Sequence, residues 1–310
     1  NKVDEIWCPT ELNITRLYNS FNFNVLTNKS NGKLMPEYER MKIGVETEGT
    51  IAKDNKRLYS YHPDVQPIKI NNFSDDRLKF VFNGSWNHRK GIKEILQAFT
   101  QAFTNKDKVS LLILSKYGNR PYGWKKFIPK YWSIQRELKN IIDLKNPNLP
   151  HIFICDVPLH EYIMPNIIAS CDVGVGASYG ESTWLPGLEY AYSGKCIIQN
   201  YAPDTCGYHD YLNSEGVFFY KNNGLSEATK ELYRGTSEYY KGMNFTTPNV
   251  DNMRNTFLEV YKIWQKDPQE LKRRGLSLRD HVSKLDYSWD SSVKNVYNRL
   301  IEINKRIGRS

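Results

Sequence analysis

The sequence predicts an α/β protein: a Rossmann-like, doubly wound parallel sheet with a C-terminal helical tail. Two observations predict this fold class. From residue 79 onward, short apolar runs alternate with segments in which apolar residues recur at helical spacing. Strands that are apolar at nearly every position are buried on both faces, which is typical of parallel strands covered by helices on each side.

The regular part of the chain contains six expected strands, at residues 79–83, 109–115, 151–155, 172–176, 195–199 and 216–220. The expected helices cover residues 90–104, 131–143, 159–169, a segment that starts near Thr183, 225–234, 250–265, 268–283 and 289–307. In a sheet of this kind, ligands bind beyond the carboxyl ends of the strands. The loops expected at that edge are 84–91, 116–124, 155–159, 177–183 and 200–209.

The first seventy or so residues lack this regularity. Residues 3–8 predict a strand and residues 10–21 a helix, whereas residues 22–72 show no sustained period and predict a linker or an irregular extension. The expected organisation is therefore a remnant or end of an N-terminal domain over 1–72, a Rossmann-like domain over 73–285 and a closing helix over 286–310. The chain starts at Asn1 without a signal-like apolar segment, which is consistent with a piece of a longer protein.

The composition is that of an ordinary soluble protein. The 310 residues have a mean hydropathy of −0.62, and no apolar run approaches the roughly 20 residues of a transmembrane helix. The net charge of +9 is spread along the sequence, which leaves open a solvated basic surface, a phosphate-bearing ligand or an anionic membrane surface. Five cysteines without a C-x-x-C pair are typical of buried free thiols in a reducing compartment. We therefore expect a cytoplasmic protein and leave peripheral attachment to a membrane open.

The most informative stretch is 171–199, where Glu181 and Glu189 are eight residues apart. Glu181 lies in a Gly-rich turn and Glu189 on the helix expected to start near Thr183. Positions seven or eight apart share a helix face, and a helix N-terminus attracts anions. The backbone amides from Ser182 to Trp184 would then open towards the same space as both carboxylates. This arrangement suits a ligand with an anionic middle and hydroxyls at both ends.

A second candidate is the loop 84–91 (GSWNHRKG), at the predicted binding edge. Gly84 permits a tight turn, and Arg89 with Lys90 places positive charge beside the start of the next helix. A basic pair before a helix is usually solvated. Its position here also fits a counter-charge for a diphosphate.

Other kinds of site lack their motifs. Gly174, Gly176 and Gly180 are similar to a dinucleotide fingerprint, but the last spacing is one residue too long and no acidic residue ends the next strand. The sequence contains no Asp-x-Asp pair, and its histidines show no metal-ligand spacing. We therefore expect neither a bound cofactor nor an obligatory metal.

Together these residues resemble the donor-sugar domain of GT-B glycosyltransferases, specifically retaining family 4. Four segments resemble that family in order: VDEIWCPTELN (3–13), FVFNGSWNHRKGIKEILQAF (80–99), GESTWLPGLEYAYSGKCII (180–198) and DYSWDSSVKNVYNRL (286–300). The third resembles the family's E-x7-E motif and is the most specific. The fourth resembles a closing helix that in this family crosses back to the first domain.

The resemblance implies a role for each candidate residue. It implies that Glu181 binds the hydroxyls of the sugar and Glu189 those of the ribose. Lys90 and Arg89 would neutralise the diphosphate, together with backbone amides of Ser182, Thr183 and Trp184. The loop Asp156, Val157, Pro158 and Leu159 would border the base. The implied reaction is metal-independent, retaining transfer of a hexosyl group from a UDP- or GDP-sugar to a glycan, lipid or protein acceptor.

Two departures from the family pattern keep alternatives open. Ser85 occupies a position that is usually basic, and most of the family's acceptor domain is missing from this sequence. The chain would then need that domain, or a partner subunit, for activity. A non-catalytic nucleotide-sugar-binding or scaffold module is the second hypothesis. A Rossmann-like enzyme of another class, acting on a phosphorylated metabolite or on nucleic acid, is the third; we expect no nucleic-acid partner.

Overall fold

The structure is a computed structural model that describes the sheet, its helices and most of the connections. The described residues are 5–8, 42–45, 61–70, 73–74, 76–116, 134–157, 159, 163–212, 215–228, 242–285, 287 and 289–306. The helix expected at 10–21 and the candidate residue Pro158 lie outside them.

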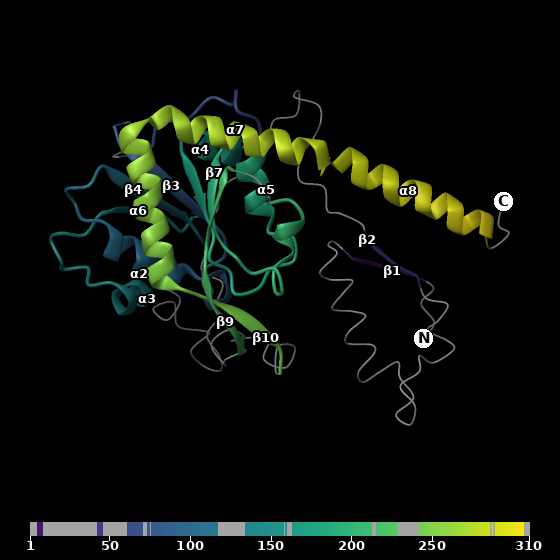
Figure 1. The fold of residues 1–310 in the computed structure, drawn as a ribbon, viewed down its shortest axis with the longest axis horizontal. Helices are drawn as coiled ribbons and strands as arrows, with labels where there is room; N and C mark the ends of the chain where they lie inside the picture. The colour runs from purple at the N-terminus through teal and green to yellow at the C-terminus, as the bar shows by residue number, and fades with distance from the viewer. Residues whose placement is uncertain are drawn as a thin grey trace.

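The core of the fold is a six-stranded, fully parallel sheet (Figure 1). Its strands are β3 (Leu78–Asn83), β4 (Val109–Leu114), β5 (His151–Cys155), β6 (Val173–Val175), β7 (Cys196–Asn200) and β8 (Val217–Tyr220). They lie in the order β5-β4-β3-β6-β7-β8. The Rossmann-like fold class is confirmed, and all six strands lie within about two residues of the expected ranges.

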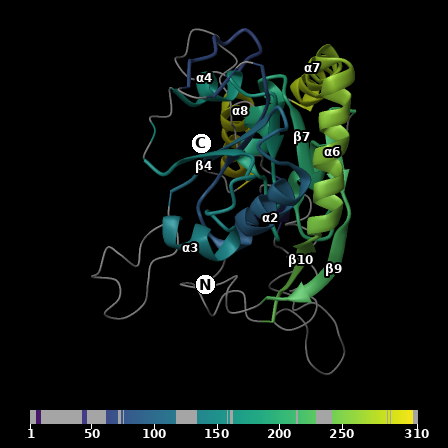
Figure 2. The same ribbon diagram turned by 90° about the vertical axis from the view of Figure 1, so that its left-hand side faces the viewer.

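Helices cover both faces of this sheet (Figure 2). On one face pack α2 (Ile92–Ala102), α3 (Ile134–Ile141) and α6 (Val250–Lys266). On the other pack α4 (Met164–Ala169), α5 (Leu185–Tyr192) and α7 (Pro268–Leu285). A hydrophobic core lies on each face of the sheet, and successive residues of one strand contribute to opposite cores. In β3, Phe80 and Phe82 lie in the core on the α2 side and Val81 in the core on the α5 side. This explains why the strands are apolar without alternation.

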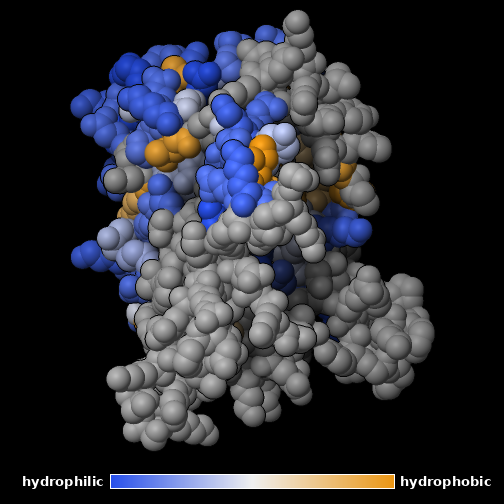
Figure 3. All heavy atoms as spheres, turned by 90° about the vertical axis from the view of Figure 1, so that its right-hand side faces the viewer, coloured by the Kyte–Doolittle hydropathy of each residue, from blue (hydrophilic) through white to orange (hydrophobic). Residues whose placement is uncertain are grey.

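The expected helical tail is confirmed. It consists of α6, α7 and α8 (Trp289–Arg306), and α8 projects away from the sheet (Figure 1). Val293 and Tyr297, one turn apart on α8, are 63% and 62% exposed. On the side of the molecule towards which α8 projects, the described surface is mainly hydrophilic, with separate hydrophobic areas (Figure 3). No helix in the described part of the chain is both long and apolar enough to cross a membrane.

Two expectations about secondary structure are wrong in the described residues. The start of the helix expected at 225–234 is instead the end of β9 (Asn222–Glu227), which pairs antiparallel with β10 (Asn244–Pro248), and residues 229–234 lie outside the described part of the chain. Nearly all of β9 is exposed, so it carries no apolar pattern. Within the supposed linker 22–72, β2 (Lys42–Val45) pairs in parallel with β1 (Glu5–Cys8). A four-residue strand is too short to show a period.

The cysteines whose side chains are described are free thiols, in agreement with the sequence. Cys171, Cys196 and Cys206 are buried and Cys155 is half-buried. Burial raises the pKa of the Cys171 and Cys196 thiols to about 12, so both stay protonated.

Candidate functional site

The candidate site lies where the order of strands reverses. β3 is flanked by β4 on one side and β6 on the other, so the connections that leave β3 and β6 start next to each other at the carboxyl edge. The connection after β3 is residues 84–91, and the one after β6 is residues 176–184. Their backbones are in contact, because the Tyr179 N–H donates to the Arg89 carbonyl over 2.9 Å. The two loops that the sequence singled out are therefore brought together.

The loop after β3 has a conformation that depends on one glycine. Residues His88–Lys90 form a 3-10 turn, and the Asn87 side chain accepts from the Lys90 N–H over 3.1 Å. Gly91 follows with φ 70°, and a Cβ atom placed on it would lie 2.0 Å from the Ala177 carbonyl oxygen. Only glycine fits this left-handed, tightly packed position. It ends the turn so that Arg89 and Lys90 precede the N-terminus of α2.

Both cations meet Glu181. The Lys90 ammonium forms an ion pair with Oε1 of Glu181, and Nη1 of Arg89 lies 3.2 Å from the same oxygen. The Ser178 hydroxyl also donates to that oxygen over 3.0 Å. Burial of Glu181 opposes its ionisation, but the charges of Lys90 and Arg89 outweigh this effect and hold the pKa of the carboxyl below its usual range. The cluster therefore contains an ionised carboxylate and two cations.

The backbone around Glu181 is held from two sides. Its N–H donates to the Thr205 carbonyl over 3.3 Å, and its carbonyl accepts from the Gly207 N–H over 3.0 Å. Arg89 Nη1 also donates to the Gly180 carbonyl over 2.5 Å. β10 supports the same turn, because the Thr246 N–H donates to the Tyr179 carbonyl over 3.0 Å. The position of the carboxylate is thus fixed by main-chain contacts from β10 and from the connection after β7.

Helix α5, which carries the half-buried Glu189, begins later than expected. Its first residue is Leu185, not Thr183, and Trp184 precedes it with a left-handed backbone, φ 54°. Pro186 accounts for the shift. A start at Thr183 would place the proline where a main-chain N–H must donate within the helix, whereas a start at Leu185 leaves it in the first turn.

Tyr211, which the sequence analysis missed, holds the segment between the two glutamates. Its buried hydroxyl lies 2.9 Å from the carbonyl oxygen of Thr183 and 2.8 Å from that of Trp184. Burial raises the pKa of this phenol well above its usual range, and the negative charges of Glu181 and Glu189 add to the rise. Both carboxylates therefore lie within electrostatic range of one hydroxyl. Nothing in the local sequence marks Tyr211, because the contact joins positions more than 25 residues apart.

The remaining candidates lie in the two loops or follow β5. Thr183 and Trp184 are each only 4% exposed, so both residues are almost wholly shielded from solvent. Gly84, Ser85 and Ser182 are half-buried or exposed in the two loops. Asp156, Val157 and Leu159 follow β5, which is an edge strand separated from β3 by β4. They lie at the same edge of the sheet as the Glu181 cluster, two strands away.

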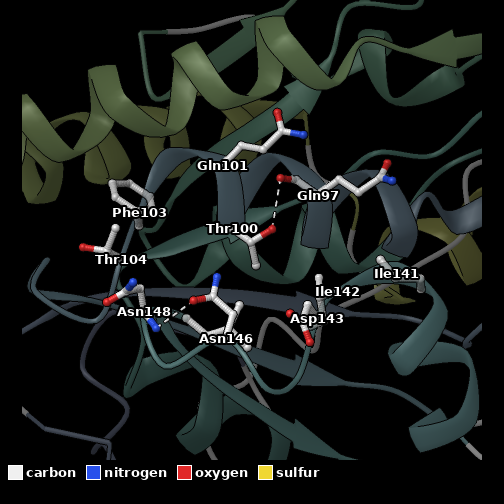
Figure 4. Close-up of a pocket in the computed structure, with 11 residues that line it drawn as sticks. Gln97, Thr100, Gln101, Phe103, Thr104, Ile141, Ile142, Asp143, Asn146 and Asn148 are labelled. Atoms are coloured by element: carbon white, nitrogen blue, oxygen red, sulfur yellow. Dashed lines mark hydrogen bonds between the residues drawn. The ribbon is translucent and has the colours of Figure 1, made fainter.

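A pocket of about 290 Å³ lies apart from this cluster (Figure 4). It is bordered by the later turns of α2, including Gln97 and Thr100, and by the loop after α3, including Asn146. The Glu181 cluster instead adjoins the first residue of α2, so the pocket belongs to another part of the molecule. Among the described residues, no group of three or more His, Cys, Asp and Glu side chains could hold a metal ion.

No protein-family model matches this sequence, and no curated protein matches it. Solved structures with a similar fold were found. A UDP-forming α,α-trehalose-phosphate synthase from Burkholderia vietnamiensis has a TM-score of 0.63 at 11% identity. The match covers 98% of this chain and 60% of the synthase chain. Sucrose-phosphate synthase from Thermosynechococcus elongatus has a TM-score of 0.59 at 14% identity. The match covers 97% of this chain and 59% of that synthase.

HepE from Anabaena, solved in complex with UDP and glucose, has a TM-score of 0.58 at 10% identity, covering 97% of this chain and 64% of that one. This chain therefore spans less than two thirds of the length of each of these proteins. At such low identity, the likeness shows a shared fold.

Proposed function

We propose that this chain is the donor-binding part of a glycosyltransferase that transfers a hexosyl group from a nucleoside-diphosphate sugar, with retention of configuration. The observation that carries the proposal is the cluster at the strand-order reversal. Lys90 and Arg89 stand there beside the N-terminus of α2, with the Glu181 carboxylate between them and Glu189 on the adjoining helix. The cations and the helix N-terminus suit a diphosphate, and the carboxylates suit the hydroxyl groups of the same ligand.

In this proposal, Lys90 and Arg89 neutralise the diphosphate. Their positions just before α2 add to the partial positive charge of the helix N-terminus. When the bond between sugar and diphosphate breaks, negative charge grows on the departing phosphate oxygen. Fixed positive charge at that place lowers the barrier to transfer and requires no metal ion.

The two glutamates receive the hydroxyl groups of the donor. Glu181, within contact of Lys90, binds the sugar next to the diphosphate, and Glu189 binds the ribose. The rim residues Asp156, Val157 and Leu159 border the base, which we expect to be uracil or guanine. These roles and the retention of configuration rest on the resemblance of residues 180–198 to the E-x7-E stretch of retaining glycosyltransferases.

The structural comparisons support this class of ligand. Two of the similar structures are named as synthases of sugar phosphates, one of them UDP-forming, and a third contains UDP and glucose. The acceptor site would come from a further domain or subunit, in keeping with the partial coverage of those proteins. A non-catalytic nucleotide-sugar-binding module is the second candidate, and the exposed Ser85 at a usually basic position favours it.

A melting-temperature panel with UDP-, GDP-, ADP- and dTDP-sugars tests the proposal. Ligand at about 100 times its Kd stabilises the folded state by about 2.7 kcal/mol, which raises the Tm of a domain this size by several degrees. We expect a UDP- or GDP-sugar to produce this rise, Glu189→Ala to remove it, and Glu215→Ala, a change at an exposed residue, to keep it. An unchanged Tm across the whole panel would contradict the proposal.

A further inference from the structure

The two cations of the proposed diphosphate site already share one carboxylate partner, Glu181. Lys90 and Arg89 both contact Oε1 of this carboxylate, Arg89 at 3.2 Å. The side chain of Glu181 is 9% exposed, whereas those of Lys90 and Arg89 are 18% and 25% exposed. An incoming diphosphate therefore competes with a carboxylate that is less accessible to water than either cation.

Removing both cations would leave Glu181 in a costly state. Of its described side-chain contacts, only the Ser178 hydroxyl, 3.0 Å from Oε1, would remain. A buried carboxylate that loses its cationic partners is strongly destabilised, because its desolvation is no longer compensated. Hydroxyl groups of a ligand can compensate it, because a carboxylate accepts several hydrogen bonds at once.

We propose that Glu181 is the counter-ion of this anion site and competes with an incoming diphosphate, so that the site selects diphosphates that carry a sugar over bare diphosphates. When a sugar diphosphate binds, each of these charged side chains exchanges its present partner for a group of the ligand. Phosphate oxygens replace Glu181 as the partners of Lys90 and Arg89, while sugar hydroxyls replace the two cations as the partners of Glu181. A bare diphosphate supplies only the first half of the exchange. For the identity of the ligand this inference rests on the proposed function, and it adds a selectivity that favours release of the nucleoside diphosphate after transfer.

The test is a calorimetric titration of inorganic pyrophosphate and of UDP into the full chain. Glu181→Gln removes the competing charge and retains the shape, so it should bind both ligands about tenfold more tightly than the wild type does. Glu181→Ala should do the same, which keeps the test usable if the glutamine variant folds poorly. Glu181→Asp retains the charge and should not tighten binding, and neither should Glu215→Gln, at an exposed surface position.

The double variant Lys90→Met/Glu181→Gln shows whether the gain comes from the released ammonium, because it should bind pyrophosphate no better than the wild type. Unchanged or weaker binding of pyrophosphate by both charge-removing variants would overturn the inference, as would absence of pyrophosphate binding in every variant. If pyrophosphate binding tightens but no sugar nucleotide binds, the counter-ion role stands and the proposed function fails. If sugar nucleotides bind and pyrophosphate binding is unchanged, the proposed function stands and this inference fails.

Discussion

The Tyr211 hydroxyl donates to the main-chain carbonyl of Trp184 over 2.8 Å, and it is also 2.9 Å from the carbonyl of Thr183. One buried side chain thus fixes two consecutive peptide groups of the segment that joins Glu181 to Glu189. Because the N–H of a trans peptide points opposite to its carbonyl, this contact also sets where the amides of Trp184 and Leu185 point.

Tyr211→Phe should therefore weaken ligand binding as well as stability. The Thr183 and Trp184 carbonyl oxygens lose the Tyr211 hydroxyl. Among the described residues, only the Trp184 carbonyl keeps a further donor, the Gly187 N–H, 2.9 Å away. The loss should cost about 1–3 kcal/mol of unfolding free energy. If the amide of Trp184 binds the diphosphate, as the proposed function requires, its orientation is also lost, so the rise in Tm with a sugar nucleotide should shrink.

Tyr208→Phe is the matched control for this prediction. The Tyr208 hydroxyl is also buried and donates to the Asn200 carbonyl over 2.6 Å, outside the Glu181–Glu189 segment. It should lower the Tm of the free protein and leave the ligand-induced rise intact. Equal losses of that rise in both variants would show that Tyr211 has no special role in the site.

The ion pairs of Glu181 predict a dependence of stability on pH. Since the folded-state pKa of this carboxyl is below its usual value of 4.5, the stabilisation is fully present above pH 4.5 and is lost as the pH falls through the lower, folded-state value. The measurement is the difference in Tm between the wild type and Glu181→Gln from pH 7 to pH 3. The difference should be constant at the upper end and should move against the wild type below about pH 4.5. A difference that stays constant to pH 3 would contradict the ion pairs.

Gly91 and Gly224 provide a matched pair for the geometry of the loop after β3. Both have a left-handed backbone, with φ 70° and φ 87°, but a Cβ atom on Gly91 would lie 2.0 Å from the Ala177 carbonyl oxygen, whereas nothing lies within 4 Å of one on Gly224. Gly224→Ala should cost about 1 kcal/mol for the backbone conformation alone. Gly91→Ala should cost about 1–3 kcal/mol more, because the loop after β6 must move.

Denaturant unfolding of the two alanine variants measures this difference. Gly91→Ala should in addition reduce binding of the sugar nucleotide, since displacement of the loop after β6 moves Glu181 relative to Lys90. Equal midpoints for the two variants would mean that the loops after β3 and β6 are not packed as described.

The main sheet could be predicted from the sequence because its strands are buried at consecutive positions. In β4 (VSLLIL), for example, every residue is buried. The β9–β10 pair could not be predicted in this way. β9 is almost fully exposed, and its partner lies some twenty residues further along the chain. Its stability depends on pairing and on contacts with the Glu181 turn, which no local pattern records.

The same distinction separates the parts of the site. Lys90 and Glu181 could be predicted to meet, because each follows a strand of the parallel sheet and such strands share a carboxyl edge. The expected start of α5 near Thr183 is two residues too early, because helical spacing alone does not show that Pro186 must lie in the first turn. The contact of Tyr211 with Thr183 and Trp184 could not be predicted, since it depends on how distant segments pack.

In the proposed function, Lys90 and its neighbours hold the diphosphate of a sugar nucleotide. The most direct test is a calorimetric titration of the sugar nucleotide that gives the largest rise in Tm, into the wild type, Lys90→Met and Lys93→Met. Lys93 is exposed and lies three residues further along, on α2, so it controls for the loss of one positive charge. We predict that Lys90→Met weakens binding by about tenfold or more and that Lys93→Met leaves it within about twofold. Undetectable binding to the wild type, or equal losses in the two variants, would contradict the account.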